Sequence, residues 1–211
     1  MTAAIIGIIV SYLLGAAVGS LVLGWFRGFD IREHGSGNAG GTNALRTQGR
    51  GFAAAVMVID VGKGVLAAWP VAGYAAAVGG APPGLVAVLC GAAAVVGHVW
   101  PVFFGFRGGK GAATLVGVVG TLAPAALLVV LATFGVVLVL SGFVGLATIL
   151  ATSSMIVWSA IALDGGLLTP FGAFAAAMTV FILYTHRSNI ARMRAGSENR
   201  FHKVMLFRAR R

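Results

Sequence analysis

Long apolar stretches, each close to the length that crosses a bilayer, follow one another along most of the chain. A transmembrane helix needs about 20 predominantly apolar residues. The first stretch runs from about Ala3 to Phe26, the second from Phe52 to about Val78, and the third from Leu85 to about Phe104. The chain is again apolar from Gly111 to Asp164 and from Leu167 to Tyr184. This pattern predicts an all-α polytopic membrane protein.

Basic side chains gather in three segments that border these stretches, and they indicate the orientation. Arg27, Arg32, Arg46 and Arg50 follow the first stretch, and Arg107 and Lys110 follow the third. The tail carries Arg187, Arg192, Arg194, Arg200, Lys203, Arg208, Arg210 and Arg211. Because cytoplasmic loops carry an excess of Lys and Arg, we expect the N-terminus outside and the C-terminus in the cytoplasm. Residues 186–211 would then form a cytoplasmic basic C-terminal segment.

The number of spans follows from this orientation. Lys110 and Arg187 must lie on the same side of the membrane, so an even number of crossings separates them. Turn signals divide the chain between them into four apolar pieces. Their bounds are Ala112 to Leu122, Ala125 to Leu140, Phe143 to Leu163 and Leu168 to Thr185. One helix kinked at Pro124 would instead give six spans and a misplaced tail, so we predict seven transmembrane helices in a single membrane domain, residues 1–211.

Composition narrows the classes of function. Of the 211 residues, 59% are hydrophobic and 9% are charged, whereas about a quarter of the residues of a soluble domain are charged. The single cysteine, Cys90, excludes a disulfide scaffold. The formal net charge of +10 indicates an anionic lipid or a phosphorylated ligand before it indicates nucleic acid.

The first segment with unusual chemistry, the Gly/Asn segment, spans residues 35–47 and reads GSGNAGGTNALRT. Its polar donors are Ser36, Asn38, Thr42, Asn43 and Arg46. Glycines let backbone N–H groups turn inward around an anion, and short hydroxyl and amide side chains add donors. A guanidinium matches phosphate oxygens. A solvated turn would explain the Gly and Asn residues alone.

The second segment, the Gly/Lys segment, spans residues 97–114 and reads GHVWPVFFGFRGGKGAAT. A Gly-rich turn with a lysine ahead of a helix suits a phosphate, because free N–H groups and the helix dipole point at the anion. The segment is not a Walker loop, which needs Gly six positions ahead of its Lys and Ser or Thr after it. Phe104 and Gly111 occupy those places, so ATP hydrolysis has no support.

The third segment, the His/Asn segment, spans residues 186–200 and reads HRSNIARMRAGSENR. His186 and Asn189 are three residues apart and would share one face of a continuing helix. The alternatives are a histidine with satisfied hydrogen bonds at the membrane interface and a basic tail that binds anionic headgroups.

Other titratable residues indicate no classical nucleophile and no metal site. Cys90 lies inside an apolar stretch, where a thiol is usually inert. The histidines show no paired spacing for zinc; they are His34, His98, His186 and His202. Asp60 and Lys63 share a helix face within the second stretch, so we expect them to pair with each other or with polar groups at the inner face.

Together the three segments resemble the bacterial acyl-phosphate-dependent glycerol-3-phosphate acyltransferases, the PlsY family. They match its GSGNxGxTNxxR, GHxxPxFxxFxGGKGxAT and HxxNIxR…GxE motifs, and the likeness covers essentially the whole chain. Gly41 replaces a usual alanine, and Ser197 a usual threonine. Gly145 and Thr148 stand where the family commonly shows two serines, so a hydroxyl survives only at Thr148.

The resemblance implies transfer of a fatty acyl group from acyl-phosphate to the sn-1 hydroxyl of sn-glycerol 3-phosphate, giving lysophosphatidic acid and phosphate. It also implies a seven-helix fold, no cofactor, no metal, and an active site at the cytoplasmic face of the bacterial plasma membrane. By resemblance the catalytic residues are Ser36, Arg46, Lys110, His186 and Asn189. The substrate-binding residues are Gly37, Asn38, Thr42, Asn43, Gly108, Gly109, Gly111, Thr148 and Glu198.

Two points stay open. Direct attack by the glycerol hydroxyl needs no acyl-enzyme, and its proton goes either to a substrate phosphate oxygen or to His186. A transporter of phosphorylated metabolites and a scaffold that binds anionic lipid are the rival functions. A transporter would need a matched pair of broken helices with cations near the bilayer centre, a pattern that this sequence does not show. A lipid-binding scaffold would not explain the Gly/Asn segment.

Overall fold

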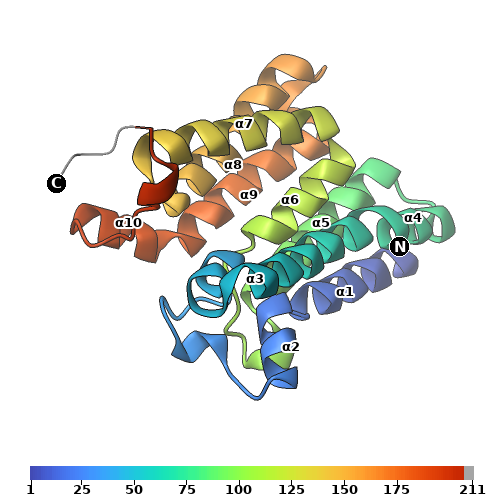
Figure 1. The fold of residues 1–211 in the computed structure, drawn as a ribbon. Coiled ribbons are helices and arrows are strands. Elements are labelled where there is room, and N and C mark those ends of the chain that lie inside the picture. The colour runs from blue at the N-terminus through green and yellow to red at the C-terminus, as the bar shows by residue number, and fades with distance from the viewer. Residues whose placement is uncertain (207–211) are drawn as a thin grey trace. The chain divides into compact units, whose positions relative to one another are not determined.

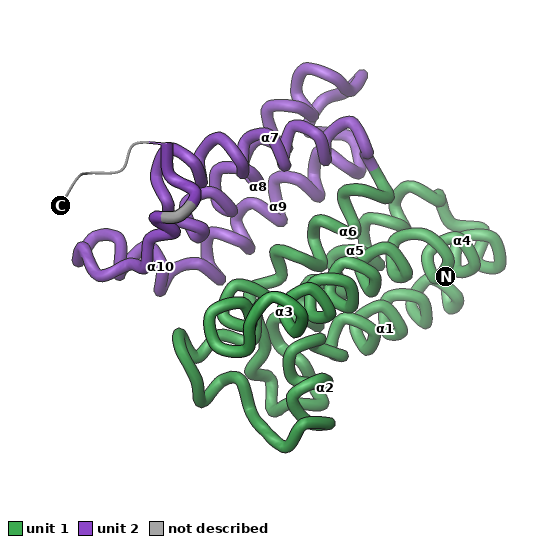
Figure 2. Tube along the Cα trace, viewed as in Figure 1, with its two compact units in different colours: residues 1–122 green, residues 123–211 purple. Residues whose placement is uncertain are grey.

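The computed structural model describes residues 1–206, which form helices and connecting turns with no strand among them. The basic residues Arg208, Arg210 and Arg211 lie outside the described residues. The chain divides into two compact units, Met1–Leu122 and Ala123–Arg211, shown in green and purple in Figure 2. That residues 1–211 act as one membrane domain stays a prediction.

The first unit is a helical bundle in which helices distant in sequence pack together (Figure 1). Its α-helices are α1 (Thr2–Ala16), α2 (Gly19–Phe26), α3 (Gly41–Leu66), α4 (Ala72–Gly79), α5 (Pro83–Val99) and α6 (Ala112–Leu122). Short 3-10 helices at Ile31–Glu33 and Val102–Phe104 and a π-helical turn at Ala67–Val71 join them. The main packing pairs are α1 with α5 and α3 with α6, as small residues allow in a membrane protein.

The first apolar stretch forms two helices, not the one span expected from Ala3 to Phe26. α1 ends at Ala16, α2 begins at Gly19, and the two helices are bent by 53°. Between them, Val18 takes extended backbone angles of φ −68° and ψ 118°. A break interrupts the ladder of intrahelical hydrogen bonds, so the backbone groups around it need other partners.

A buried polar cluster supplies those partners. Its members are Asp60, Lys63 and His98. Asp60 Oδ1 accepts a hydrogen bond from the backbone N–H of Gly19 at 3.0 Å. Lys63 Nζ donates to the carbonyl oxygens of Gly15 at 2.8 Å and Ala17 at 3.3 Å. The cluster therefore replaces hydrogen bonds that the helix break removes.

The cluster also engages one nitrogen of His98. Lys63 Nζ lies 2.9 Å from Asp60 Oδ1 and 2.8 Å from His98 Nδ1, and His98 Nδ1 lies 3.4 Å from Asp60 Oδ1. Nδ1 is therefore the nitrogen that faces the two charged groups. The predicted pairing of Asp60 with Lys63 is confirmed. The participation of His98 was not predicted.

α3 begins earlier than the apolar pattern indicated, at Gly41 and not near Phe52. Gly49 has φ 82° and ψ −177°, so a short helix ahead of it joins the apolar part of α3 through a sharp turn. Glycine adopts such angles without a steric penalty. Thr42 and Arg46 therefore lie on a short helix, where the sequence indicated a loop.

The second unit is built around α8. Its α-helices are α7 (Pro124–Ser141), α8 (Val144–Ala162), α9 (Pro170–Thr185) and α10 (Arg187–Arg194), with short 3-10 helices at Gly166–Leu168 and His202–Val204. α8 packs against both α7 and α9, and α10 contacts α8 and α9. Ala123 has non-helical angles of φ −150° and ψ 78°, so α6 and α7 are two helices, not one helix kinked at Pro124.

Within residues 1–206, four helical segments are long and apolar enough to cross a membrane. They are Gly41–Gly79, Pro83–Phe104, Pro124–Ser141 and Val144–Ala162. The bent pair of α1 and α2 is a fifth if it counts as one span, and Ala112–Leu122 and Pro170–Thr185 are shorter apolar helices. The chain is an all-helical, multi-pass membrane protein. Seven crossings and the orientation of the termini stay predictions.

The substitution Lys63→Met tests the role of the cluster in stability. It leaves Asp60 and the carbonyl groups at the helix break without their cation, and removal of one partner from a buried ion pair costs about 3–5 kcal/mol. The thermal unfolding midpoint in detergent should fall by many degrees. Val58→Ala, at an exposed position of the same helix, is the matched control and should change the midpoint little. A midpoint for Lys63→Met equal to that of the wild type would contradict the assignment.

Candidate functional site

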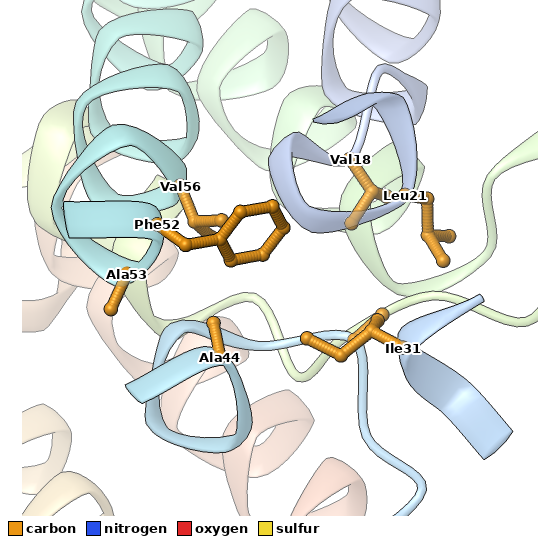
Figure 3. Close-up of a cluster of buried hydrophobic side chains, with 8 residues drawn as sticks. Val18, Leu21, Ile31, Ala44, Phe52, Ala53 and Val56 are labelled. Carbon is orange, nitrogen blue, oxygen red and sulfur yellow. The ribbon is translucent and has the colours of Figure 1, made fainter. Parts of the chain in front are cut away.

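An apolar cluster anchors the loop that leads into the Gly/Asn segment (Figure 3). Its buried members are Val18, Leu21, Ile31, Ala39, Ala44, Phe52, Ala53 and Val56. Ile31 lies where the loop begins and Ala39 where it ends, and both side chains are fully buried. Ser20 Oγ also donates to the carbonyl of Ala39 at 2.8 Å. Both sides of the loop are therefore held, while Ser36 between them is exposed.

Asn43 holds the same loop from within. Its amide Nδ2 donates to the carbonyl oxygens of Ile31 at 3.2 Å and His34 at 2.9 Å. Its Oδ1 accepts from the backbone N–H of Ser36 at 2.9 Å. A buried amide engaged at both ends shapes the backbone around it. The structure thus shows that Asn43 positions Ser36, and its expected substrate contact stays a prediction.

The other polar residues of the Gly/Asn segment surround the start of α3. Asn38 and Thr42 are half-buried there, and Arg46 is exposed one turn further along. The first N–H groups of a helix have no intrahelical acceptor and carry partial positive charge. That this helix start binds an anion through its backbone amides, the Thr42 hydroxyl and the Arg46 guanidinium stays a prediction.

The Gly/Lys segment folds back on the end of α5. The N–H of Gly108 donates to the carbonyl of Val99 and that of Gly109 to the carbonyl of His98, both at 3.1 Å. These two amides are engaged by carbonyl groups, and that Gly108 and Gly109 contact a substrate stays a prediction. Gly111, with φ 85°, leads into α6. Half-buried Lys110 and the first amides of α6 are what this segment offers to a ligand.

An ion-paired arginine joins the two segments. Arg32 Nη2 lies 2.6 Å from Asp30 Oδ2, and Arg32 Nη1 donates to the carbonyls of Phe104 and Arg107, both at 2.9 Å. Hydrogen bonding from Arg32 lowers the pKa of Asp30 and keeps that carboxylate ionised. The loop before Ser36 is therefore tied to the loop before Lys110. Nothing in the sequence distinguished Arg32 from the other basic residues.

His186 lies at the junction where α9 ends and α10 begins, and its side chain is buried. Its Nδ1 lies 2.9 Å from the carbonyl oxygen of Ile182. A carbonyl only accepts, so Nδ1 donates the hydrogen bond. The N–H of Ile190 donates to the carbonyl of His186 at 3.0 Å, which places Asn189 in the first turn of the same helix.

Glu198 organises the rest of the His/Asn segment. Asn189 Nδ2 donates to Glu198 Oε1 at 2.8 Å, and Arg192 Nε donates to Glu198 Oε2 at 2.6 Å. Both carboxylate oxygens therefore anchor the segment, and that Glu198 also binds substrate stays a prediction. α8 approaches this group at Gly145, where an added Cβ would lie 2.9 Å from the Asn189 side chain. The absence of a side chain at Gly145 gives Asn189 its room.

Thr148 is buried in α8, and its hydroxyl donates to the carbonyl of Val144 at 2.9 Å. The chain beyond α10 returns to the end of α7. Phe201 N–H donates to the carbonyl of Gly142 at 2.8 Å, and Leu206 N–H to that of Val139 at 3.1 Å. These bonds satisfy carbonyl groups that a helix end leaves open. The described part of the basic segment is thus docked on its own unit.

The structure brings the predicted residues together in two groups. In the first unit, the Gly/Asn and Gly/Lys segments are tied to each other through Arg32. In the second unit, the residues from His186 to Glu198 gather around α10 and α8. Within residues 1–206, no three His, Cys, Asp or Glu side chains are grouped so that they could hold a metal ion.

Comparisons with known proteins agree with one another. A family model described as glycerol-3-phosphate acyltransferase matches residues 5–196. The glycerol-3-phosphate acyltransferase of Desulforudis audaxviator is 44% identical over 200 residues, with 94% of this chain and 96% of the relative covered. That of Chlorobaculum tepidum is 39% identical over 221 residues, with 92% and 94% covered.

Two crystal structures of PlsY, an integral membrane glycerol 3-phosphate acyltransferase, have the same fold. The glycerol 3-phosphate form matches with a TM-score of 0.83 at 34% identity, with 94% of this chain and 95% of that chain covered. The lysophosphatidic acid form matches with a TM-score of 0.81 at the same identity.

Proposed function

The chain belongs to the glycerol-3-phosphate acyltransferase family, the family of PlsY, and on that premise we propose that its acyl donor is acyl-phosphate. The acceptor is the sn-1 hydroxyl of sn-glycerol 3-phosphate, and the products are lysophosphatidic acid and inorganic phosphate. This reaction is the first acylation step of phospholipid biosynthesis. The proposal rests on the hydrogen bonds that Arg32 donates to the carbonyls of Phe104 and Arg107. These bonds hold together two segments that are rich in hydrogen-bond donors for an anion.

Both proposed substrates carry a phosphate, and the first unit offers groups for both. Arg32 is engaged by Asp30 and two carbonyls, so it serves the frame. We assign ligand contact to Arg46, with Ser36, Thr42 and the amides at the start of α3. Lys110 and the amides at the start of α6 bind the acyl-phosphate headgroup, and Lys110 neutralises phosphate as it leaves.

The second unit is assigned the orientation of the acceptor. His186 and Asn189 bind glycerol 3-phosphate, and Glu198 holds Asn189 in place through the 2.8 Å hydrogen bond. Nδ1 of His186 lies 2.9 Å from the carbonyl oxygen of Ile182, which fixes the orientation of the ring. Thr148, buried in α8, is assigned to the same acceptor site.

The reaction needs no acyl-enzyme intermediate, because acyl-phosphate is already activated. The glycerol oxygen forms a bond to the acyl carbonyl carbon, and the bond from that carbon to the phosphate oxygen breaks. Phosphate leaves with the electron pair, and the hydroxyl proton passes to a substrate phosphate oxygen. Positioning of the two reactants can lower the barrier by about 7–11 kcal/mol, and cationic groups at the leaving phosphate add to this.

We also infer that the chain crosses the bacterial plasma membrane seven times, with its N-terminus outside and the active site at the cytoplasmic face. The distribution of basic residues supports this orientation. The exposed Trp25 lies two residues before Arg27. Trp is enriched at both membrane–water interfaces, so this position supports the depth of the segment in the membrane and not its side.

Purified protein in lipid vesicles, given palmitoyl-phosphate and glycerol 3-phosphate, should release inorganic phosphate in amounts equal to the lysophosphatidic acid formed. Palmitoyl-CoA should not replace palmitoyl-phosphate. Turnover with palmitoyl-CoA and none with palmitoyl-phosphate would overturn the donor assignment. Arg46→Ala should lower kcat/KM about 100-fold or more, the usual effect of losing one donor to developing charge. Arg50→Ala, an exposed arginine beyond the turn at Gly49, is the matched control and should retain activity.

His186→Gln tests where the proton goes. Gln keeps hydrogen-bonding groups but does not titrate near neutral pH. With a substrate phosphate as the base, the variant should lose activity through weaker orientation while its pH–rate profile keeps the wild-type shape. The comparison is kcat/KM measured from pH 5.5 to pH 9 for both proteins. If the rise of activity with pH disappears in the variant, His186 is the base and the substrate-assisted route is wrong.

A further inference from the structure

We propose that the buried Asp60–Lys63–His98 cluster positions Lys110 for the reaction, by forming the surface on which the Gly108-Gly109 turn rests. The inference rests on the proposed function, because it serves the role assigned to Lys110. All three side chains of the cluster are buried. They therefore act through the turn and not by touching a substrate, which makes them positioning residues.

The cluster holds the imidazole of His98 in one orientation. Lys63 Nζ lies 2.8 Å from His98 Nδ1 and is itself held by Asp60 at 2.9 Å. The carbonyls of Gly15 and Ala17, at the break between α1 and α2, take the other contacts of the ammonium. With Nδ1 engaged in this way, the opposite edge of the ring faces the Gly/Lys segment.

That ring edge is in direct contact with the turn. An added Cβ on Gly109 would overlap His98 Nε2 and lie 3.1 Å from both Cδ2 and Cε1 of the ring. The backbone N–H of Gly109 also donates to the carbonyl of His98 at 3.1 Å. Gly109 is therefore required by the side chain of His98.

Gly108 is required for a different reason. An added Cβ there would overlap the main-chain carbonyl oxygen of His98 and lie 2.7 Å from Cδ of Pro101. Removal of the His98 side chain therefore makes no room at Gly108, although it does make room at Gly109. The two neighbouring glycines thus provide a variant pair in which only one overlap can be relieved.

The close packing of Gly109 and Gly111 fixes the backbone position of Lys110 between them. Gly109 packs on His98 before it, and Gly111 after it is close to α5, where an added Cβ would lie 2.8 Å from Cγ1 of Val95. A turn packed this closely cannot shift without moving the lysine backbone. A displaced turn should therefore move Lys110 relative to the phosphate that it neutralises, and kcat should fall.

The competing explanation is that the glycines are needed because the backbone touches a ligand. The two explanations differ in one respect. If Gly109 is needed to accommodate His98, a smaller residue at position 98 should restore a Gly109→Ala enzyme. If the backbone of Gly109 contacts a ligand, a change at position 98 should restore nothing.

The test measures phosphate release from palmitoyl-phosphate and glycerol 3-phosphate for five variants. They are Gly109→Ala, Gly108→Ala, His98→Asn and the two double variants that combine His98→Asn with each alanine. Asn keeps an acceptor for Lys63 but lacks the far edge of the imidazole. Gly109→Ala should lower kcat about 100-fold with a small change in KM, because a displacement near 1 Å can cost that much.

His98→Asn should restore kcat at least tenfold in the Gly109→Ala background and should restore nothing in the Gly108→Ala background. Equal recovery in both backgrounds, or none in either, would overturn the inference. Unfolding midpoints of the same proteins show which variants fold, and His98→Ala replaces His98→Asn if the latter does not. If the wild type is active with neither palmitoyl-phosphate nor palmitoyl-CoA, the proposed function itself is wrong. If the wild type is active but His98→Asn rescues neither alanine variant, only the present inference is wrong.

Discussion

A backbone N–H or C=O group that loses its intrahelical hydrogen bond inside a membrane protein needs another hydrogen-bond partner, because the bilayer core offers no water. The break between α1 and α2 creates this need at Gly15, Ala17 and Gly19, and Asp60 and Lys63 meet it. A buried ion pair carries a desolvation cost, which its hydrogen bonds partly offset. Here the ammonium also reaches His98, so the cluster that closes the helix break also contacts the turn ahead of Lys110.

The residues around the proposed site are of two kinds, those that hold the backbone in place and those assigned to ligand contact. One kind builds the frame: Asn43 shapes the loop around Ser36, Arg32 ties two loops together, and Glu198 anchors α10. We assign the other kind, with Arg46 and Lys110 as its main members, to ligand contact. Because frame residues engage backbone carbonyls and amides, they hold the backbone that carries these proposed ligand contacts, which is how preorganised sites stabilise developing charge.

Much of the fold could be predicted from the sequence, because apolar stretches and turn signals report helix bounds directly. α6 begins and ends at the predicted Ala112 and Leu122, between Gly111 and Pro124. The break at Ala17 and Val18 could not be predicted, since neither residue disfavours a helix and the partners that allow the break lie far along the chain. The engaged amides of Gly108 and Gly109 escaped prediction for the same reason: a glycine turn has the same sequence whether its N–H groups face a ligand or a carbonyl.

The central claim is that donors from three distant segments serve one reaction from the cytoplasmic side. Single cysteines at Ser36, Phe106 and Ser197, which are exposed, test it most directly, because the native Cys90 is buried and gives little background. An impermeant maleimide should label all three in inverted membrane vesicles and none in intact spheroplasts. Labelling of any one of them in spheroplasts would contradict the account.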